Sequence, residues 1–126
     1  VLHTAAQFGN DCMCRALHEA GADVNAPTKD GFTPICIAAQ DGYDSTVRIL
    51  HELGADVKAP NNNDATPTLI AAENGHDSTV RLLHELGADV KAPKNNGVTP
   101  TYIAAQNGHD RVIARLRTLE RTHLRA

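Results

Sequence analysis

Two stretches of the sequence begin like the zinc-binding motif of a metalloprotease. His51-Glu52 and His84-Glu85 each place a histidine directly before a glutamate. In the full His-Glu-x-x-His motif, a second histidine one helical turn later completes the zinc site, and the glutamate acts as the general base. The fifth position is Ala55 in the first stretch and Ala88 in the second. Because the second ligand is missing from both, the sequence gives no support for a metalloprotease.

Three histidines recur at one spacing, since His18, His51 and His84 are each 33 residues apart. On stacked helices, whose axes lie roughly 8–10 Å apart, they would form a parallel row. A zinc ion needs ligand nitrogens that all lie about 2.0–2.1 Å from it. A parallel row does not converge in that way, so we predict a structural row at the edge of a helical layer and no metal site.

The cysteines do not indicate a disulfide or a metal site. Their number is odd, Cys12 and Cys14 are too close for an ordinary disulfide, and they lack Cys-x2-Cys spacing. We expect Cys14 to fill the core, Cys12 to be partly exposed and Cys36 to be packed, without a base that would make it a nucleophile. Free thiols favour a reducing compartment, so we expect a cytoplasmic location.

Other kinds of chemical site fit no better. The stretch Asn61-Asn62-Asn63-Asp64 is rich in oxygen but lacks the glycine and the glutamate of a calcium loop. No glycine-rich phosphate loop is present. Carboxylates that recur with a repeat do not make the paired arrangement of a hydrolase. We therefore predict no enzymatic activity and no cofactor.

The charge distribution argues against nucleic acid as the main partner. Residues 111–126 hold five arginines against Glu120, whereas the other residues hold 7 basic and 14 acidic side chains. No aromatic side chains accompany these arginines as a stacking surface for bases. We expect the basic tip to be a solvated end cap; attraction of an acidic partner is the alternative. No apolar run approaches the ~20 residues needed to span a bilayer.

The chain repeats itself every 33 residues. Residues 41–60 and 74–93 differ at three positions only. The same period separates three Thr-Pro pairs and two sets of glycines, which are Thr33-Pro34, Thr66-Pro67 and Thr99-Pro100; Gly9, Gly42, Gly75 and Gly108; and Gly21, Gly54 and Gly87. A fixed period of this length indicates a solenoid, in which each unit buries its apolar face against its neighbours.

The sequence of each 33-residue unit predicts two short helices and a connecting turn. Thr33 is a good N-cap and Pro34 suits the first helical position. Gly42 ends this helix in a left-handed conformation. We predict that Asp44 caps the second helix, which ends at Gly54 and buries an apolar face made of Val47, Leu50 and Leu53.

The turns between units carry hairpin signals. Asp30-Gly31 and Asn96-Gly97 are typical two-residue hairpin pairs, in which both residues have positive φ. The middle turn has Asp64 where the others have glycine. We therefore expect that turn to be slightly strained or mobile.

These residues resemble the ankyrin repeat. The matching pieces in the third unit are Thr66-Pro67, Ala71-Ala72, Gly75-His76, Leu82-Leu83 and Gly87-Ala88-Asp89-Val90. The resemblance covers the whole chain and implies an all-α ankyrin-repeat solenoid of about four helix-turn-helix repeats with projecting β-hairpin turns. It implies one domain, residues 1–126, with repeats at about 1–27 (partial), 28–60, 61–93 and 94–126.

The sequence departs from the family pattern at two positions. The family usually has a histidine two residues after Thr-Pro, where it hydrogen-bonds neighbouring loops. Only His3 keeps it, and the other repeats have Cys36, Leu69 and Tyr102. The family asparagine after Asp-Val survives at Asn25 and is replaced by Lys58 and Lys91. These changes bear on loop rigidity and not on the fold.

The resemblance implies a non-catalytic scaffold that binds another protein on a concave face made of the turns and the first helices. Phe8, Phe32 and Val98 are the candidate apolar anchors, and Gln7 and Phe8 are the first repeat's contribution. The predicted contact residues of the second, third and fourth repeats are Lys29, Asp30, Phe32, Gln40 and Asp41; Asn62, Asn63, Ala65, Glu73 and Asn74; and Asn95, Asn96, Val98, Gln106 and Asn107.

The N-terminal end of the solenoid suggests an alternative function. Cys12, Met13, Cys14 and Ala16 lie on a helix without the polar outer face that a terminal repeat needs. The chain would then be an assembly fragment of a longer solenoid that self-associates through its repeat ends.

Overall fold

The computed structural model describes residues 2–125, with side chains as far as Glu120. This range contains eight α-helices and no β-strand. The helices are α1 (Leu2–Gln7), α2 (Asp11–Glu19), α3 (Pro34–Gln40), α4 (Asp44–Glu52), α5 (Pro67–Glu73), α6 (Asp77–Glu85), α7 (Pro100–Gln106) and α8 (Asp110–Arg125).

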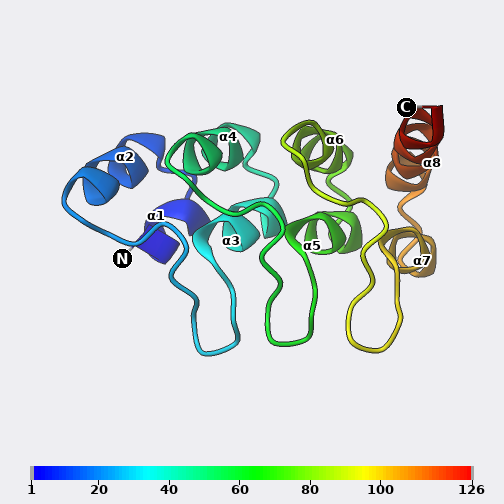
Figure 1. The fold of residues 1–126 in the computed structure, drawn as a ribbon, viewed down its shortest axis with the longest axis horizontal. Helices are drawn as coiled ribbons and strands as arrows, with labels where there is room; N and C mark the ends of the chain where they lie inside the picture. Colours follow the sequence, from blue (N-terminus) through cyan, green and yellow to red (C-terminus); the bar gives the residue numbers. More distant parts are fainter. Residues whose placement is uncertain (1, 126) are drawn as a thin grey trace.

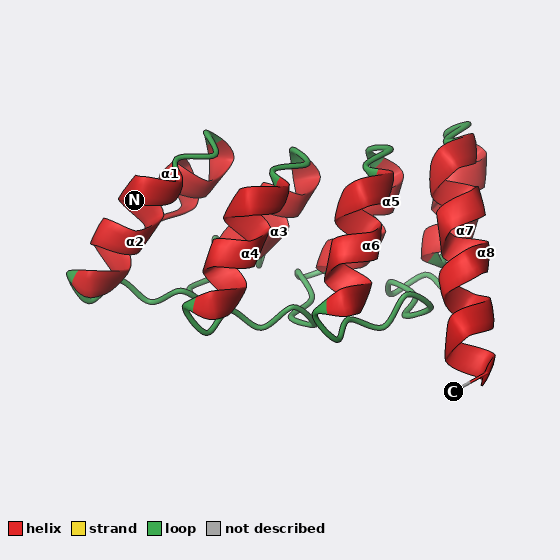
Figure 2. Cartoon of the chain, turned by 90° about the horizontal axis from the view of Figure 1, so that it is seen from above, coloured by secondary structure: helices red, strands yellow, loops and turns green. Residues whose placement is uncertain are grey.

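The helices form two parallel layers, as Figure 1 shows. Helices α1, α3, α5 and α7 make one row, and α2, α4, α6 and α8 make the second row above it. Each helix contacts its counterpart in the next repeat and its partner within the repeat. Viewed from above, the four pairs stand side by side along the long axis (Figure 2). The all-α repeat solenoid predicted from the sequence is confirmed.

The first helix of each full repeat begins as the sequence predicts. The hydroxyl oxygens of Thr33, Thr66 and Thr99 accept hydrogen bonds from backbone N–H groups three residues later, at 3.2–3.4 Å. A proline follows each cap at the first helical position. An N-cap of this type stabilises a helix by about 1 kcal/mol.

The second helices begin differently from our prediction. The residue before α4 is Tyr43, which makes no side-chain capping bond, and Asp44 is the first helical residue. The prediction that Asp44 caps the helix was therefore wrong. Its carboxylate instead accepts hydrogen bonds from the hydroxyls of Ser78 (2.7 Å) and Thr79 in the next repeat. It still places negative charge at the positive end of the helix.

Similar carboxylate links cross the other two junctions of the second layer. Asp11 accepts a hydrogen bond from Thr46. Asp77 forms an ion pair with Arg115 at 3.5 Å, and the position aligned with Thr46 and Thr79 is Val112. We call these contacts the carboxylate links: each joins an aspartate at the start of one second helix to the second helix of the following repeat.

The core is built from small and aliphatic side chains between the two layers. Alanines of the first helices, such as Ala38 and Ala71, are fully buried and let adjacent helices approach closely. Leu50 and Leu83 of the second helices are fully buried as well. Cys14 and Cys36 are buried and Cys12 is exposed, which agrees with the sequence predictions for the three thiols.

The projecting turns are not the two-residue hairpins that we predicted. Thr28 N–H donates to Phe32 O (3.0 Å) and Gly31 N–H donates to Thr28 O (2.9 Å), which is the pattern of a three-residue loop. Such a loop needs only one residue with positive φ, and Gly31 supplies it at 84°. The turns at 61–65 and 94–98 repeat both bonds.

Asp64 is the one non-glycine residue with positive φ in the described chain, at 63°. This left-handed conformation is the physical basis of the strain predicted for that turn. The turn with Asp64 also receives no side-chain bond from the turn that follows it. Asn62 Nδ2 donates to Lys29 O of the preceding turn, whereas the aligned Asn95 donates only from its backbone, to Asn63 O.

Replacing Asp64 with glycine is expected to raise the free energy of unfolding by about 1 kcal/mol, because glycine adopts positive φ without steric cost. Urea unfolding followed by circular dichroism measures the change. Asp30→Gly is the control, since Asp30 does not have positive φ and glycine there only adds entropy to the unfolded chain. Equal effects of the two substitutions would contradict the assignment of strain to Asp64.

Candidate protein-binding groove

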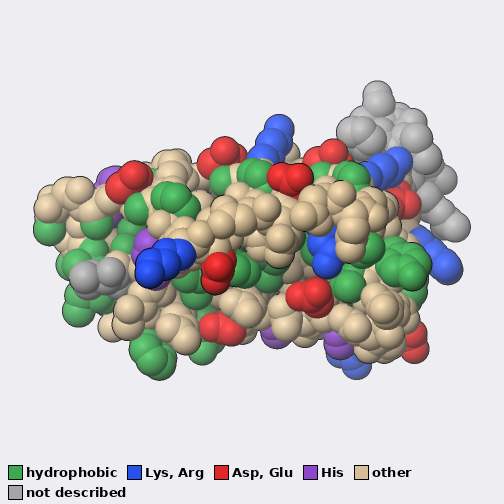
Figure 3. Space-filling model, turned by 90° about the horizontal axis from the view of Figure 1, so that it is seen from below, with side chains coloured by type: hydrophobic (Ala, Val, Ile, Leu, Met, Phe, Trp, Pro, Cys, Tyr) green, Lys and Arg blue, Asp and Glu red, His purple; other side chains and the backbone are tan. Residues whose placement is uncertain are grey.

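Most of the predicted contact residues come from two places, the turn tips and the ends of the first helices. Lys29, Asp30 and Asn63 are exposed at turn tips, and Gln40 and Gln106 are exposed at the ends of α3 and α7. Figure 3 views the chain from the side of the projecting turns. Charged side chains of both signs are scattered there among uncharged ones, with hydrophobic side chains visible between them.

A first hollow lies between the first and second repeats. Its volume is about 310 Å³. The lining residues are Gln7, Thr28, Phe32, Ile37, Gln40 and Asp41. The polar groups at its edge are therefore two amides, a hydroxyl and the Asp41 carboxylate, while Phe32 and Ile37 supply apolar surface.

A second hollow of about 170 Å³ lies beside the first, between the second and third repeats. Phe32 and Gln40 line it too, so the two hollows share a wall. Its other lining residues are Asn61, Asn63, Ala65, Leu69, Ile70, Glu73 and Lys94. Ala65, which we predicted as a contact, is only 6% exposed. We call the two hollows together the concave groove.

Several predicted contact residues hold the solenoid together with their amide groups. Asn62 donates from its backbone N–H to Asp30 O (3.0 Å) and from Nδ2 to Lys29 O (2.7 Å). Asn107 Nδ2 donates to Glu73 O (3.1 Å), and Asn74 Nδ2 donates to Ile70 O (2.9 Å). The bonds of Asn62 and Asn107 join neighbouring repeats, whereas the bond of Asn74 lies within the end of α5.

The structure does not bring all of the predicted residues together. Neither hollow is lined by Phe8, by Lys29, Asp30, Asn62 or Asn74, or by the predicted residues of the fourth repeat, which are Asn95, Asn96, Val98, Gln106 and Asn107. Conversely, six lining residues were not predicted as contacts: Thr28, Ile37, Asn61, Leu69, Ile70 and Lys94. The sequence signal for Ile37 was ambiguous, because it lies in the apolar run of a first helix and looks like a core residue.

The repeat architecture matches a known family. A family model of ankyrin repeats in three copies matches residues 1–61 and 53–121. The chain belongs to the ankyrin-repeat family. Ankyrin repeats generally serve as protein–protein interaction modules and are generally not catalytic. No curated protein sequence matches the chain.

This ankyrin-repeat chain keeps one loop contact of the family with two different donors. His3 Nε2 lies 2.5 Å from Ala26 O. The aligned Cys36 donates from its thiol to Ala59 O at 3.6 Å. Burial raises the pKa of the Cys36 thiol, which keeps it protonated and able to donate. Leu69 is an apolar side chain at the same position of the next repeat and offers no donor.

The other groups considered for chemistry stay apart in this ankyrin-repeat chain. His18, His51 and His84 are partly buried on successive second helices. Burial, with a smaller contribution from Asp11, raises the pKa of Cys14. Within the described residues, no three His, Cys, Asp or Glu side chains are grouped closely enough to hold a metal ion. None of the helices in the described part is long and apolar enough to cross a bilayer.

Proposed function

We propose that the concave groove binds an extended segment of a partner protein, with Phe32 as the main apolar anchor. The observation that carries this proposal is the position of Phe32 as the wall shared by both hollows. A partner side chain on either side of the ring would bury apolar area against it. Binding energy usually concentrates in a few such anchors, which are often aromatic.

The surroundings of Phe32 suit recognition of a polar backbone. Gln40 also lines both hollows, and its side chain offers two donors and an acceptor. Asp41 and Glu73 add carboxylates, and Lys94 adds an ammonium group. This mixture favours a partner with hydrogen-bonding groups of both kinds rather than a partner of strong single charge.

The rigidity of the turns lowers the cost of binding. Asn62 bonds to two carbonyls of the preceding turn, and Asn95 N–H bonds to Asn63 O at 2.8 Å. Because the turns are already held in register, little conformational entropy is lost when a partner binds.

Phe32→Ala is expected to weaken partner binding by about 1–2 kcal/mol without unfolding the chain. A partner would first be captured from a native lysate, identified by mass spectrometry and produced separately. Isothermal titration calorimetry then compares wild type with Phe32→Ala. The control is Tyr102→Ala, which removes an aromatic side chain that is 59% exposed and lines neither hollow. Unchanged affinity in Phe32→Ala, or an equal loss in both variants, would reject the anchor.

A second candidate function is self-association through α2. Met13 is 46% exposed, and Cys12 and Ala16 beside it are exposed as well. At the same helical position Thr46 is fully buried against the preceding repeat. The face that interior repeats bury is therefore open at α2.

Light scattering at several concentrations tests this second candidate. Self-association predicts an apparent mass that rises with concentration in wild type. Met13→Glu, which puts a charge on the exposed face, should return the mass to that of one chain. A constant single-chain mass in wild type rules the candidate out.

We also propose a reducing, cytoplasmic location. The support is that all three cysteines are free thiols and that two of them are buried in the core, where a disulfide cannot form without rearrangement. Immunofluorescence microscopy of the native protein tests this assignment.

A further inference from the structure

One asparagine side chain joins the first two connecting loops. The Asn25 carboxamide, in the loop after α2, reaches the loop after α4. Its Nδ2 donates to Gly54 O (3.3 Å), and its Oδ1 accepts from Asp56 N–H (2.8 Å). A primary carboxamide thus satisfies one backbone acceptor and one backbone donor at the same time.

The next junction has the same backbone groups and no carboxamide. Lys58 stands where Asn25 does, and Gly87 and Asp89 stand where Gly54 and Asp56 do. Neither Gly87 O nor Asp89 N–H has a hydrogen-bond partner among the described residues. A lysine side chain offers only donors, so the Lys58 side chain cannot accept from Asp89 N–H.

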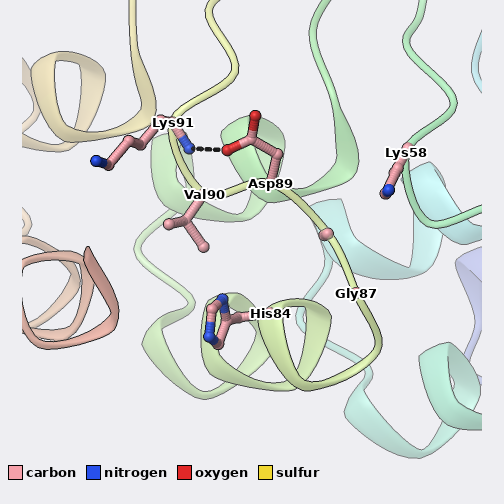
Figure 4. A pocket seen from close by; sticks show the side chains of 7 residues that line it. Lys58, His84, Gly87, Asp89, Val90 and Lys91 are labelled. Atoms are coloured by element: carbon pink, nitrogen blue, oxygen red, sulfur yellow. Dashed lines mark hydrogen bonds between the residues drawn. The ribbon is translucent and has the colours of Figure 1, made fainter. Parts of the chain in front are cut away.

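A cavity of about 410 Å³ lies at this position. Its lining residues are Lys58, His84, Gly87, Ala88, Asp89, Val90 and Lys91. Figure 4 shows Lys58 well to the side of Gly87 and Asp89, with His84 on the opposite side of the cavity from Lys91 and Asp89. The space next to Gly87 is open, since no heavy atom lies within 4 Å of the point where a Cβ would be.

The loop backbone has the same local shape at both junctions. Lys91 N–H donates to Asp89 Oδ1 at 2.9 Å, the bond drawn in Figure 4. Lys58 N–H donates to Asp56 Oδ1 at the same distance. Since the two loops share this turn, the free acceptor and donor at Gly87 and Asp89 have the arrangement that receives Asn25 at the first junction.

We propose that this cavity is a binding site for a primary carboxamide, the side chain of an asparagine or glutamine of a partner protein. A carboxylate of similar shape could accept from Asp89 N–H but has no hydrogen to donate to Gly87 O. Lys58 and Lys91 would attract a carboxylate, so the comparison of amide with acid decides between recognition by hydrogen bonding and attraction by charge.

This site is separate from the concave groove. It shares no lining residue with either hollow and does not depend on the proposed role of Phe32. The following junction does not repeat it, because the chain at Glu120, aligned with Gly87, is still helical.

Titration of the ¹⁵N-labelled chain with N-acetyl-asparagine N-methylamide tests the proposal by NMR. The Asp89 N–H resonance is expected to shift saturably, with a dissociation constant in the millimolar range for so small a probe. The Asp56 N–H resonance, already bonded by Asn25, is the internal control and should not respond. N-acetyl-aspartate N-methylamide is the control probe and should move Asp89 N–H much less.

Two variants complete the test. Lys58→Asn supplies the carboxamide from within the chain, so it should abolish the response of Asp89 N–H and raise Tm by about 2–6 °C. Asn25→Ala should make Asp56 N–H respond to the asparagine probe as Asp89 N–H does. The proposal is overturned by a silent Asp89 N–H, by an equal response to the aspartate probe, or by a Lys58→Asn variant that responds like wild type.

Discussion

Replacing Gly31 with alanine is expected to lower the free energy of unfolding by about 3 kcal/mol. Gly31 has φ of 84°, and a Cβ there would lie 2.5 Å from Asn62 Oδ1 and 2.7 Å from Asn62 N. The left-handed conformation alone costs an alanine about 1–2 kcal/mol. The clash would also displace the two hydrogen bonds that Asn62 donates to Lys29 O and Asp30 O, each worth about 1 kcal/mol.

Gly97→Ala is the matched control for this prediction. Gly97 has nearly the same φ, 82°, but no heavy atom lies within 4 Å of the point where its Cβ would be. It should therefore lose only the conformational part, about 1–2 kcal/mol. Urea unfolding curves of the two variants measure the difference, and equal losses would show that contact between neighbouring turns contributes little to stability.

Two buried threonines should respond in opposite directions when each is replaced by valine. Thr79 and Thr68 are both fully buried. The Thr79 hydroxyl donates to the Asp44 carboxylate, whereas Thr68 Oγ1 has no hydrogen-bond partner. Thr79→Val should lower the free energy of unfolding by about 2 kcal/mol, because it removes a hydrogen bond to a charged group. Thr68→Val should raise it by about 1 kcal/mol, because it removes an unsatisfied polar group.

The same urea titration measures both threonine variants, and the pair controls for the change in shape from threonine to valine. If Thr79→Val were neutral, the carboxylate links would add nothing to stability. A destabilised Thr68→Val would mean that its hydroxyl is hydrated in solution.

The periodic features of the fold could be predicted because they depend on one repeat at a time. Thr33 caps a helix through a bond to Cys36 N–H, three residues away. Gly42 and Gly54 have φ of 72° and 104° just after helix ends, as their sequence positions indicate. Such local preferences recur every 33 residues, so each repeat supports the interpretation of the others.

Contacts between repeats could not be predicted in the same way. Asp44 at a helix start is typical of a capping residue, and only the stacked structure shows Ser78 and Thr79 facing it. The turns were misjudged because Asp30-Gly31 fits two loop lengths, and only the register of Thr28 with Phe32 distinguishes them.

The candidate groove was predictable as a region and less so as a set of residues. The positions of the turns and of the first-helix ends follow from the period, which placed Phe32, Gln40 and Glu73 in the groove. The sequence does not show whether an asparagine in a turn faces a partner or the neighbouring turn. Asn63 lines a hollow, whereas Asn62 donates to the preceding turn.

The carboxylate links give the array a direction and make it extensible. Residues 77–109 carry both halves of a link, the acceptor Asp77 and the donors Ser78 and Thr79. If a copy of residues 77–109 were inserted after residue 109, the original Asp77 would accept from the serine and threonine of the inserted copy. The aspartate of the inserted copy would then pair with Arg115. The array could therefore be lengthened by inserting whole copies of residues 77–109. The first and fourth repeats could not serve as the inserted unit, because they have Met13 and Val112 in place of a donor threonine.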